Sequence, residues 1–199
     1  NILHIKADHF FRYKSYEMYH TAGVAVPVFS LRSENGYGVG EFRDLKSLAD
    51  WSSKTNLGII QILPINDTSA NNSWTDSYPY SAISTFALHP QYLALDALDF
   101  PFPKILVKDF EAEKSTLNEL DSIDYYPMIA GKWKYINAIF EENETKILAD
   151  KNFKKFIKLN ESWLLPYSAF CVQREQYKTA DFTSWKTHKK YIAGKIAPF

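Results

Sequence analysis

The first half of the chain alternates between apolar runs and one amphipathic stretch. Residues 22–31 (AGVAVPVFSL) and 58–65 (GIIQILPI) are rich in β-branched side chains and show no polar alternation, which is typical of strands buried on both faces. Between them, apolar residues of 41–55 recur at helical spacing behind acidic side chains, which predicts an amphipathic helix. Strand, helix and strand in this order predict a βαβ unit with two parallel strands.

Charge and helical spacing dominate the second half of the chain, from about residue 109. The apolar positions predict helices that carry Phe110, Leu117 and Leu120; Trp133, Ile136, Ile139 and Phe140; Phe153, Phe156, Ile157 and Leu159; and, beginning around Pro166, Ala169, Phe170, Val172 and Tyr177. We therefore divide the chain into an α/β part, residues 1–100, and a mainly helical part, residues 101–199.

Two loops follow the predicted strands, and binding sites of parallel sheets form at the carboxyl ends of strands. The first loop, SENGYGVG (33–40), is rich in glycine but has neither a GK[ST] ending nor a GxGxxG spacing. Glu41 follows it and would repel a phosphate at the start of the helix. The second loop, residues 66–90, is therefore the expected binding site.

The loop 66–90 combines aromatic rings with carboxylates and amides. These side chains are Trp74, Tyr78 and Tyr80, Asp67 and Asp76, and Asn66, Asn71 and Asn72. Sugars present apolar C–H faces and hydroxyl edges, which match rings to stack on and carboxylates that accept hydroxyl protons. In the structural alternative the rings pack the loop onto the sheet and Asp76 caps a turn. The residues alone leave both interpretations open.

Composition narrows the class of partner. Apolar residues make up 46% and charged residues 23% of the chain, which is ordinary for a globular domain. Because the formal net charge is zero, there is no electrostatic reason to expect nucleic acid or an anionic membrane as a partner. Aromatic residues reach 16%; we expect most rings in a core and the remainder in a site that stacks on flat or ring-shaped ligands.

The single cysteine, Cys171, excludes an intrachain disulfide and favours a reducing compartment, the cytoplasm. The apolar runs are shorter than the ~20 residues of a membrane helix, and no secretory signal opens the chain. An initiator Met is also missing, so we expect a piece of something longer. The histidines are scattered as His4, His9, His20, His89 and His188, and neither HExxH nor GxSxG occurs, so no metal site and no serine nucleophile are predicted.

Four segments carry a resemblance to a known family. They are AGVAVPVFSLRSENGYGVGEFRDLKSLADW (22–51), IIQILPINDT (59–68), SWTDSYPYSAISTFALHPQYLALDAL (73–98) and NESWLLPYSAFCVQREQY (160–177). Together they resemble the start of the catalytic domain of 4-α-glucanotransferases, the amylomaltase or disproportionating enzyme family. The NDT and DSYPYS…ALHP forms look most like the plant cytosolic type and its bacterial relatives. The helical middle matches only loosely.

The resemblance implies a (β/α)₈ TIM barrel, of which this chain holds the first two βα units followed by a helical insertion subdomain. Members of the family transfer α-1,4-glucan segments by a retaining double displacement, with an Asp nucleophile and a Glu acid/base and without cofactor or metal. Those carboxylates come from later strands, beyond Phe199. No catalytic residue is therefore assigned here, and the piece alone is expected to be inactive.

The same resemblance assigns substrate-binding residues to the loop. Tyr80 corresponds to the family tyrosine that stacks on the sugar at the cleavage point. Asp76 and Ser77 match the residues that precede it and are expected to shape or line the pocket, with Tyr78 and Trp74 beside them. The expected ligand is an α-1,4-glucan or maltooligosaccharide.

Two other functions stay open besides the glucanotransferase. A non-catalytic glucan-binding module could use the Trp74–Tyr80 loop without chemistry, and a helical interaction domain (109–190) would need an exposed apolar stripe between Trp133 and Phe140. An incomplete barrel leaves sheet edges unpaired, so we expect contact with the remainder of the catalytic domain or self-association.

Overall fold

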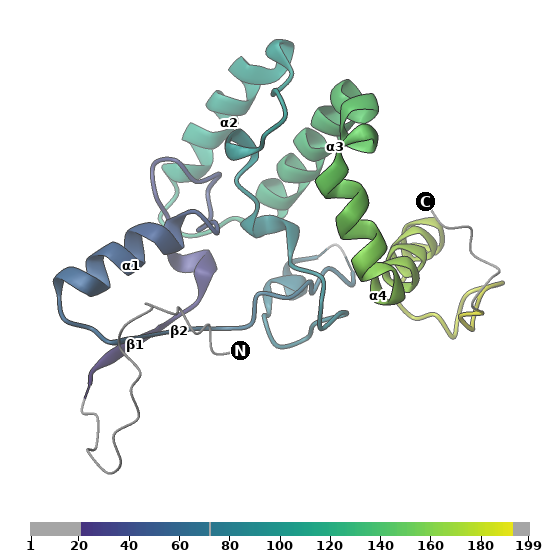
Figure 1. Ribbon diagram of the computed structural model, residues 1–199, viewed down its shortest axis with the longest axis horizontal. Coiled ribbons are helices and arrows are strands. Elements are labelled where there is room, and N and C mark those ends of the chain that lie inside the picture. Colours follow the sequence, from purple (N-terminus) through teal and green to yellow (C-terminus); the bar gives the residue numbers. More distant parts are fainter. Residues whose placement is uncertain (1–20, 72, 193–199) are drawn as a thin grey trace.

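A computed structural model describes residues 21–71 and 73–192 (Figure 1). Strands β1 (Gly23–Val26) and β2 (Ile59–Ile62) pair in parallel, with Gly23 opposite Ile59 and Val26 opposite Ile62. Helix α1 (Asp44–Lys54) connects them, which confirms the predicted βαβ unit. A two-stranded sheet with helices is compatible with the start of an α/β barrel, and the barrel itself stays a prediction.

The strands are shorter and more open than the sequence indicates. After β1, Pro27 lacks an amide donor, and the chain turns into the 3₁₀ segment η1 (Val28–Ser30). Along both strands, exposed residues alternate with half-buried ones, and Ile59 is 52% exposed. The expected burial of both sheet faces is therefore not met within the described residues, because no further strand or helix covers β1 and β2 there.

Three long helices form the second half: α2 (Val107–Asn118), α3 (Tyr125–Ala149) and α4 (Lys151–Tyr177). Short 3₁₀ segments precede them: η2 (Trp74–Ser77), η3 (Pro90–Tyr92), η4 (Leu95–Ala97) and η5 (Lys104–Leu106). The prediction that a separate helix begins around Pro166 is wrong, because α4 runs through Pro166 without interruption. A proline inside a helix removes one backbone hydrogen bond. Next to Pro166, the Tyr167 hydroxyl donates to Asp67 of the loop 66–90, and this tertiary contact stabilises the helix there.

The main hydrophobic core combines residues from both sides of position 100. It consists of Tyr37, Val39, Leu95, Phe110, Leu117, Tyr125, Met128, Ile129, Tyr135 and Ile139. Tyr37 stacks on Phe110 with ring centroids 5.2 Å apart and donates a hydrogen bond to Glu113 at 2.5 Å. Gly131 of α3 lets this ring approach, since a Cβ there would stand 2.3 Å from the Tyr37 hydroxyl oxygen. The boundary at residue 100 stays a prediction.

The glycine-rich loop attaches the α/β part to α2. The Arg32 guanidinium donates to the last carbonyls of α2, at 3.0 Å to Leu117 and 3.1 Å to Asn118. The Asn118 side chain in turn accepts from the amide of Gly38 at 3.0 Å and donates to the carbonyl of Gly36 at 2.8 Å. Gly38 has a φ of 71°, where side chains are disfavoured. The loop therefore has a structural role at the end of a helix.

A buried ion pair joins α3 to the region after β1. The Lys132 ammonium, fully buried, lies 2.7 Å from Glu41 and also donates to the carbonyls of Gln91 and of Leu93, the latter at 2.8 Å. Arg43 lies 2.9 Å from the second oxygen of Glu41. Burial raises the pKa of Glu41 and lowers the pKa of Lys132, and their mutual attraction opposes both shifts. Glu41, expected in the first turn of the helix, thus precedes α1 and is a core residue.

No helix in residues 21–71 and 73–192 is long and apolar enough to cross a membrane.

Candidate functional site

The loop 66–90 is closed at its base by main-chain hydrogen bonds. Asn66 and Leu88 form an isolated antiparallel bridge, and the Asp67 amide donates to the carbonyl of Ala87 at 2.9 Å. The Ile83 amide donates to the carbonyl of Asp67 at 2.8 Å. These bonds fix where the loop leaves β2 and where it returns, so the segment between them is held at both ends.

Asp76 lies inside the loop. It is 3% exposed, and its carboxylate accepts the amide of Asn71 at 2.9 Å. The Thr68 hydroxyl donates to the main-chain carbonyl of Asp76. These contacts hold the interior of the loop together, which agrees with a structural role for this residue. A direct contact of Asp76 with substrate stays a prediction, as does a role for the half-buried Ser77 beside it.

Three aromatic rings of the same loop face solvent. Trp74 is 74% exposed, and Tyr78 and Tyr80 are each 58% exposed. The rings of Tyr78 and Tyr80 have centroids 5.3 Å apart and are inclined by 54°. Exposed rings with polar edges on an anchored backbone suit the apolar face of a sugar. The structure thus brings Tyr78 and Tyr80 into contact and leaves Trp74 exposed on the same loop; we call these three rings the aromatic group of the loop 66–90.

Asp67 is buried and saturated by hydrogen bonds of the protein. It is 1% exposed; one oxygen accepts the amide of Ser69 at 2.9 Å and the Ser69 hydroxyl, and the other accepts the Tyr167 hydroxyl at 2.6 Å. A carboxylate with these donors is not available to a sugar hydroxyl. Asp67 therefore serves the shape of the loop.

His89 at the end of the loop is a buried polar residue whose role its sequence context does not indicate. Its Nδ1 accepts the amide of Gln91 at 3.1 Å, and its Nε2 lies 3.3 Å from the Tyr125 hydroxyl. Burial lowers the pKa of His89 to about 4, against the attraction of Asp67 and Asp76, so the ring is neutral at pH 7. The side chain joins the loop to α3.

Metal-ligating groups do not gather in the part of the chain that the structure describes, where no three His, Cys, Asp or Glu residues form a metal site. Four residues considered from the sequence, His4, His9, His20 and Asn72, lie outside the described residues.

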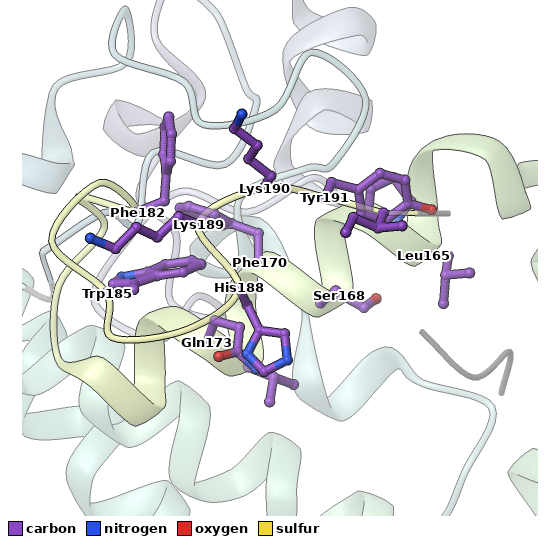
Figure 2. Close-up of a pocket in the computed structure, with 14 residues that line it drawn as sticks. Leu165, Ser168, Phe170, Gln173, Phe182, Trp185, His188, Lys189, Lys190 and Tyr191 are labelled. Atoms are coloured by element: carbon purple, nitrogen blue, oxygen red, sulfur yellow. The ribbon is translucent and has the colours of Figure 1, made fainter. Parts of the chain in front are cut away.

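A cavity of about 810 Å³ lies between the second half of α4 and the segment that follows it (Figure 2). Trp185, 3% exposed, forms part of its wall together with Phe170 and Phe182, and Lys189 and Lys190 carry positive charge beside it. None of the predicted binding residues line this cavity. The aromatic group of the loop 66–90 is therefore a separate, exposed feature.

Comparisons with known proteins agree with the motifs. A family model described as 4-alpha-glucanotransferase matches residues 26–197. The 4-alpha-glucanotransferase DPE2 of rice is 43% identical over 175 residues, which are 88% of this chain and 18% of the relative. The 4-alpha-glucanotransferase of Chlamydia muridarum is 32% identical over 166 residues, 83% of this chain and 31% of the relative. That of Clostridium butyricum is 30% identical over 150 residues, 75% of this chain and 29% of the relative.

The chain covers less than a third of the length of each of these relatives, between 18% and 31%. The family match begins at the last residue of β1 and extends over α1, β2, the loop 66–90 and α2 to α4. The resemblance to the plant type and its bacterial relatives is thereby confirmed. This chain belongs to the 4-alpha-glucanotransferase family.

Proposed function

We propose that the chain is part of a longer 4-alpha-glucanotransferase, called the parent enzyme below, and that its loop 66–90 forms one wall of the glucan-binding cleft. One observation carries this proposal: Trp74, Tyr78 and Tyr80 are exposed while the backbone beneath them is held by buried carboxylates. Rings on a fixed support stack on a sugar with little loss of conformational entropy. Family membership supports an α-1,4-glucan or maltooligosaccharide as that sugar.

In the proposed reaction, a carboxylate outside this chain attacks the anomeric carbon of the donor glucan while a carboxylic acid, also outside it, protonates the leaving oxygen. The 4-hydroxyl of an acceptor sugar then displaces the carboxylate of the covalent intermediate and gives its proton to the residue that had acted as the acid, with net retention of configuration. The ring of Tyr80 contributes by stacking on the sugar at the cleavage point, where its negative face favours the developing positive charge. Asp67 and Asp76 take no part as nucleophile or acid, since both are buried in contacts of the loop.

The test is turnover of maltooligosaccharides by the parent enzyme. Tyr80→Ala should lower kcat/KM by about tenfold, the loss expected for an aromatic stacking contact, and Tyr80→Phe should keep most of the activity because it keeps the ring. Tyr126→Ala is the matched control, since Tyr126 is a tyrosine of α3 that is 65% exposed. Unchanged turnover of Tyr80→Ala would remove the ring from the site.

A non-catalytic glucan-binding module is the alternative with the same ligand. The parent enzyme should disproportionate maltotriose into shorter and longer oligosaccharides, whereas a module would bind without changing their lengths. The isolated 199-residue chain should bind but not transfer, because the catalytic carboxylates are expected outside it. Transfer by the isolated chain would show that its own carboxylates act.

Location in the cytoplasm stays a prediction.

A helical interaction surface is favoured by one observation, the exposure of Trp133 (38%) and Phe140 (41%), one heptad apart on α3. If this stripe binds a protein partner, the double variant Trp133→Ser with Phe140→Ser should no longer form the complex with that partner, as measured by sedimentation. Glucan transfer should stay unchanged.

A further inference from the structure

One face of α4 contacts the aromatic loop at three points. Trp163, Tyr167 and Arg174 are spaced by four and seven residues, which places them on the same side of the helix. They contact Phe86, Asp67 and Ser69 respectively, all of which belong to the loop 66–90. We call these three residues of α4 the α4 clamp. In Figure 1 the loop lies beside α4, although the two are far apart in the sequence.

The first contact of the α4 clamp is a stack of rings. Trp163 and Phe86 have centroids 5.5 Å apart and planes inclined by 17°. The Trp163 indole N–H donates to the Asn160 side chain at 2.9 Å, which fixes the orientation of the ring. Trp163 therefore presents a rigid surface to Phe86, near the end of the loop 66–90.

The second and third contacts are hydrogen bonds to buried groups. The Tyr167 hydroxyl donates to Asp67 at 2.6 Å, and burial together with this acceptor raises the pKa of Tyr167, so the hydroxyl keeps its proton. Arg174, 6% exposed, donates to the main-chain carbonyl of Ser69. Both bonds end at the start of the loop, where the chain leaves β2, on Asp67 and Ser69, which are almost fully buried.

A short path joins the α4 clamp to the exposed rings. Asp67 and Ser69, the two loop residues that the clamp holds by hydrogen bonds, flank Thr68, whose hydroxyl donates to the carbonyl of Asp76. Asp76 lies in η2, which begins at Trp74 and ends directly before Tyr78. The exposed rings take their position from this buried layer, because their own faces are turned to solvent.

We propose that the α4 clamp positions the exposed rings of the loop 66–90 for glucan binding, with Tyr167 as the positioning residue. This inference rests on the proposed function. If the hydroxyl of Tyr167 is lost, the buried Asp67 carboxylate lacks one donor, and conformations in which the loop leaves α4 become populated. Glucan binds only the clamped conformation, so its apparent affinity falls in proportion to the population of that conformation.

The experiment uses Tyr167→Phe in the parent enzyme, which removes a hydroxyl and keeps the ring. The KM for maltoheptaose should rise about tenfold with kcat unchanged, because saturating glucan restores the clamped loop. A loss of folded enzyme would instead lower kcat at constant KM. Without glucan, amide hydrogen exchange should become faster in the loop 66–90 and stay unchanged in α2.

The matched control is Tyr177→Phe, which removes the hydroxyl that contacts Thr187, on the same helix but away from the loop. It should change neither KM nor exchange in the loop. Arg174→Gln tests the second bond independently and should reproduce the rise in KM and in exchange should Tyr167→Phe fail to fold.

Unchanged exchange in the loop of both variants would overturn the clamp. Faster exchange with unchanged KM would also overturn it, and Tyr80→Ala then identifies the cause. If Tyr80→Ala lowers kcat/KM, the loop binds glucan and only the clamp fails. If Tyr80→Ala has no effect either, the proposed glucan site fails as well.

Discussion

Replacing Lys132 by Met tests whether the buried ion pair holds the end of the aromatic loop against α3. The substitution keeps the length of the side chain and removes the ammonium. Glu41, 1% exposed, would keep Arg43 at 2.9 Å but lose the partner at 2.7 Å. The carbonyls of Gln91 and Leu93, which accept from the same ammonium, would lose a donor.

Breaking a buried ion pair by removing one partner costs about 3–5 kcal/mol, because the remaining charge is left in a medium that solvates it poorly. We expect a loss of about 3 kcal/mol, at the low end, since Arg43 still neutralises Glu41. Lys134 provides a control two residues away on α3. Its pair with Glu113 has a similar distance, 2.8 Å, but side chains that are 47% and 39% exposed, so Lys134→Met should cost at most about 1 kcal/mol.

Native-state hydrogen exchange of the parent enzyme measures the loss locally. The amide of Phe42 donates to the carbonyl of Tyr92 at 2.9 Å, between the two carbonyls that Lys132 holds. In Lys132→Met this amide should exchange about 100-fold faster than in the wild type, the factor that corresponds to about 3 kcal/mol. Lys134→Met should change it by less than about tenfold.

A double variant separates the charge from the packing. Because Lys132→Met with Glu41→Gln leaves no unpaired ion, its loss of stability should be smaller than the sum of the two single losses. Equal exchange of the Phe42 amide in Lys132→Met and Lys134→Met would refute the reasoning, since burial would then make no difference to the value of the pair. Strict additivity in the double variant would refute the assigned coupling.

Three further outcomes follow from the same structure. Burial lowers the pKa of His89 to about 4, below its value in the unfolded chain, so the unfolded chain takes up a proton first as the pH falls. The free energy of unfolding should therefore fall by about 3 kcal/mol from pH 6.5 to pH 4. In urea unfolding, His89→Gln should show a weaker pH dependence. Gly131→Ala should destabilise despite the higher helix propensity of alanine, because its Cβ would meet the Tyr37 ring, and a raised Tm would contradict this. The isolated chain should self-associate through the open edges of β1 and β2, and a monodisperse monomer in sedimentation would argue against that.

The βαβ unit could be predicted from the sequence because its signals are local. Each strand is an apolar run, and α1 has a regular spacing of apolar positions, so three elements were found within a few residues of their bounds. The exposure of the Trp74, Tyr78 and Tyr80 rings did not follow from the residues alone, which left stacking on a ligand and packing onto the sheet both open. The ends of the strands depend on which neighbours cover them, which the local pattern does not contain.

The buried polar residues could not be predicted, because their partners are distant in the sequence. Lys132 stands in a helix where lysine is ordinarily solvent-exposed, and Glu41 lies ninety-one positions earlier. Similarly, nothing near Asp67 indicates that its donor is Tyr167. Pro166 suggested the start of a helix for the same reason, since the contacts that let α4 continue through it are tertiary.

The separation of Asp67 and Tyr167 by one hundred positions has a consequence for biosynthesis. At the ribosome, the aromatic loop emerges long before the helix that holds it, an interval of about 5–20 s at common elongation rates. During that time its rings and the open edges of two short strands are accessible to other nascent chains and to chaperones. We expect a translational pause placed between these two segments to lower the yield of native protein, whereas the same pause after α4 would be harmless.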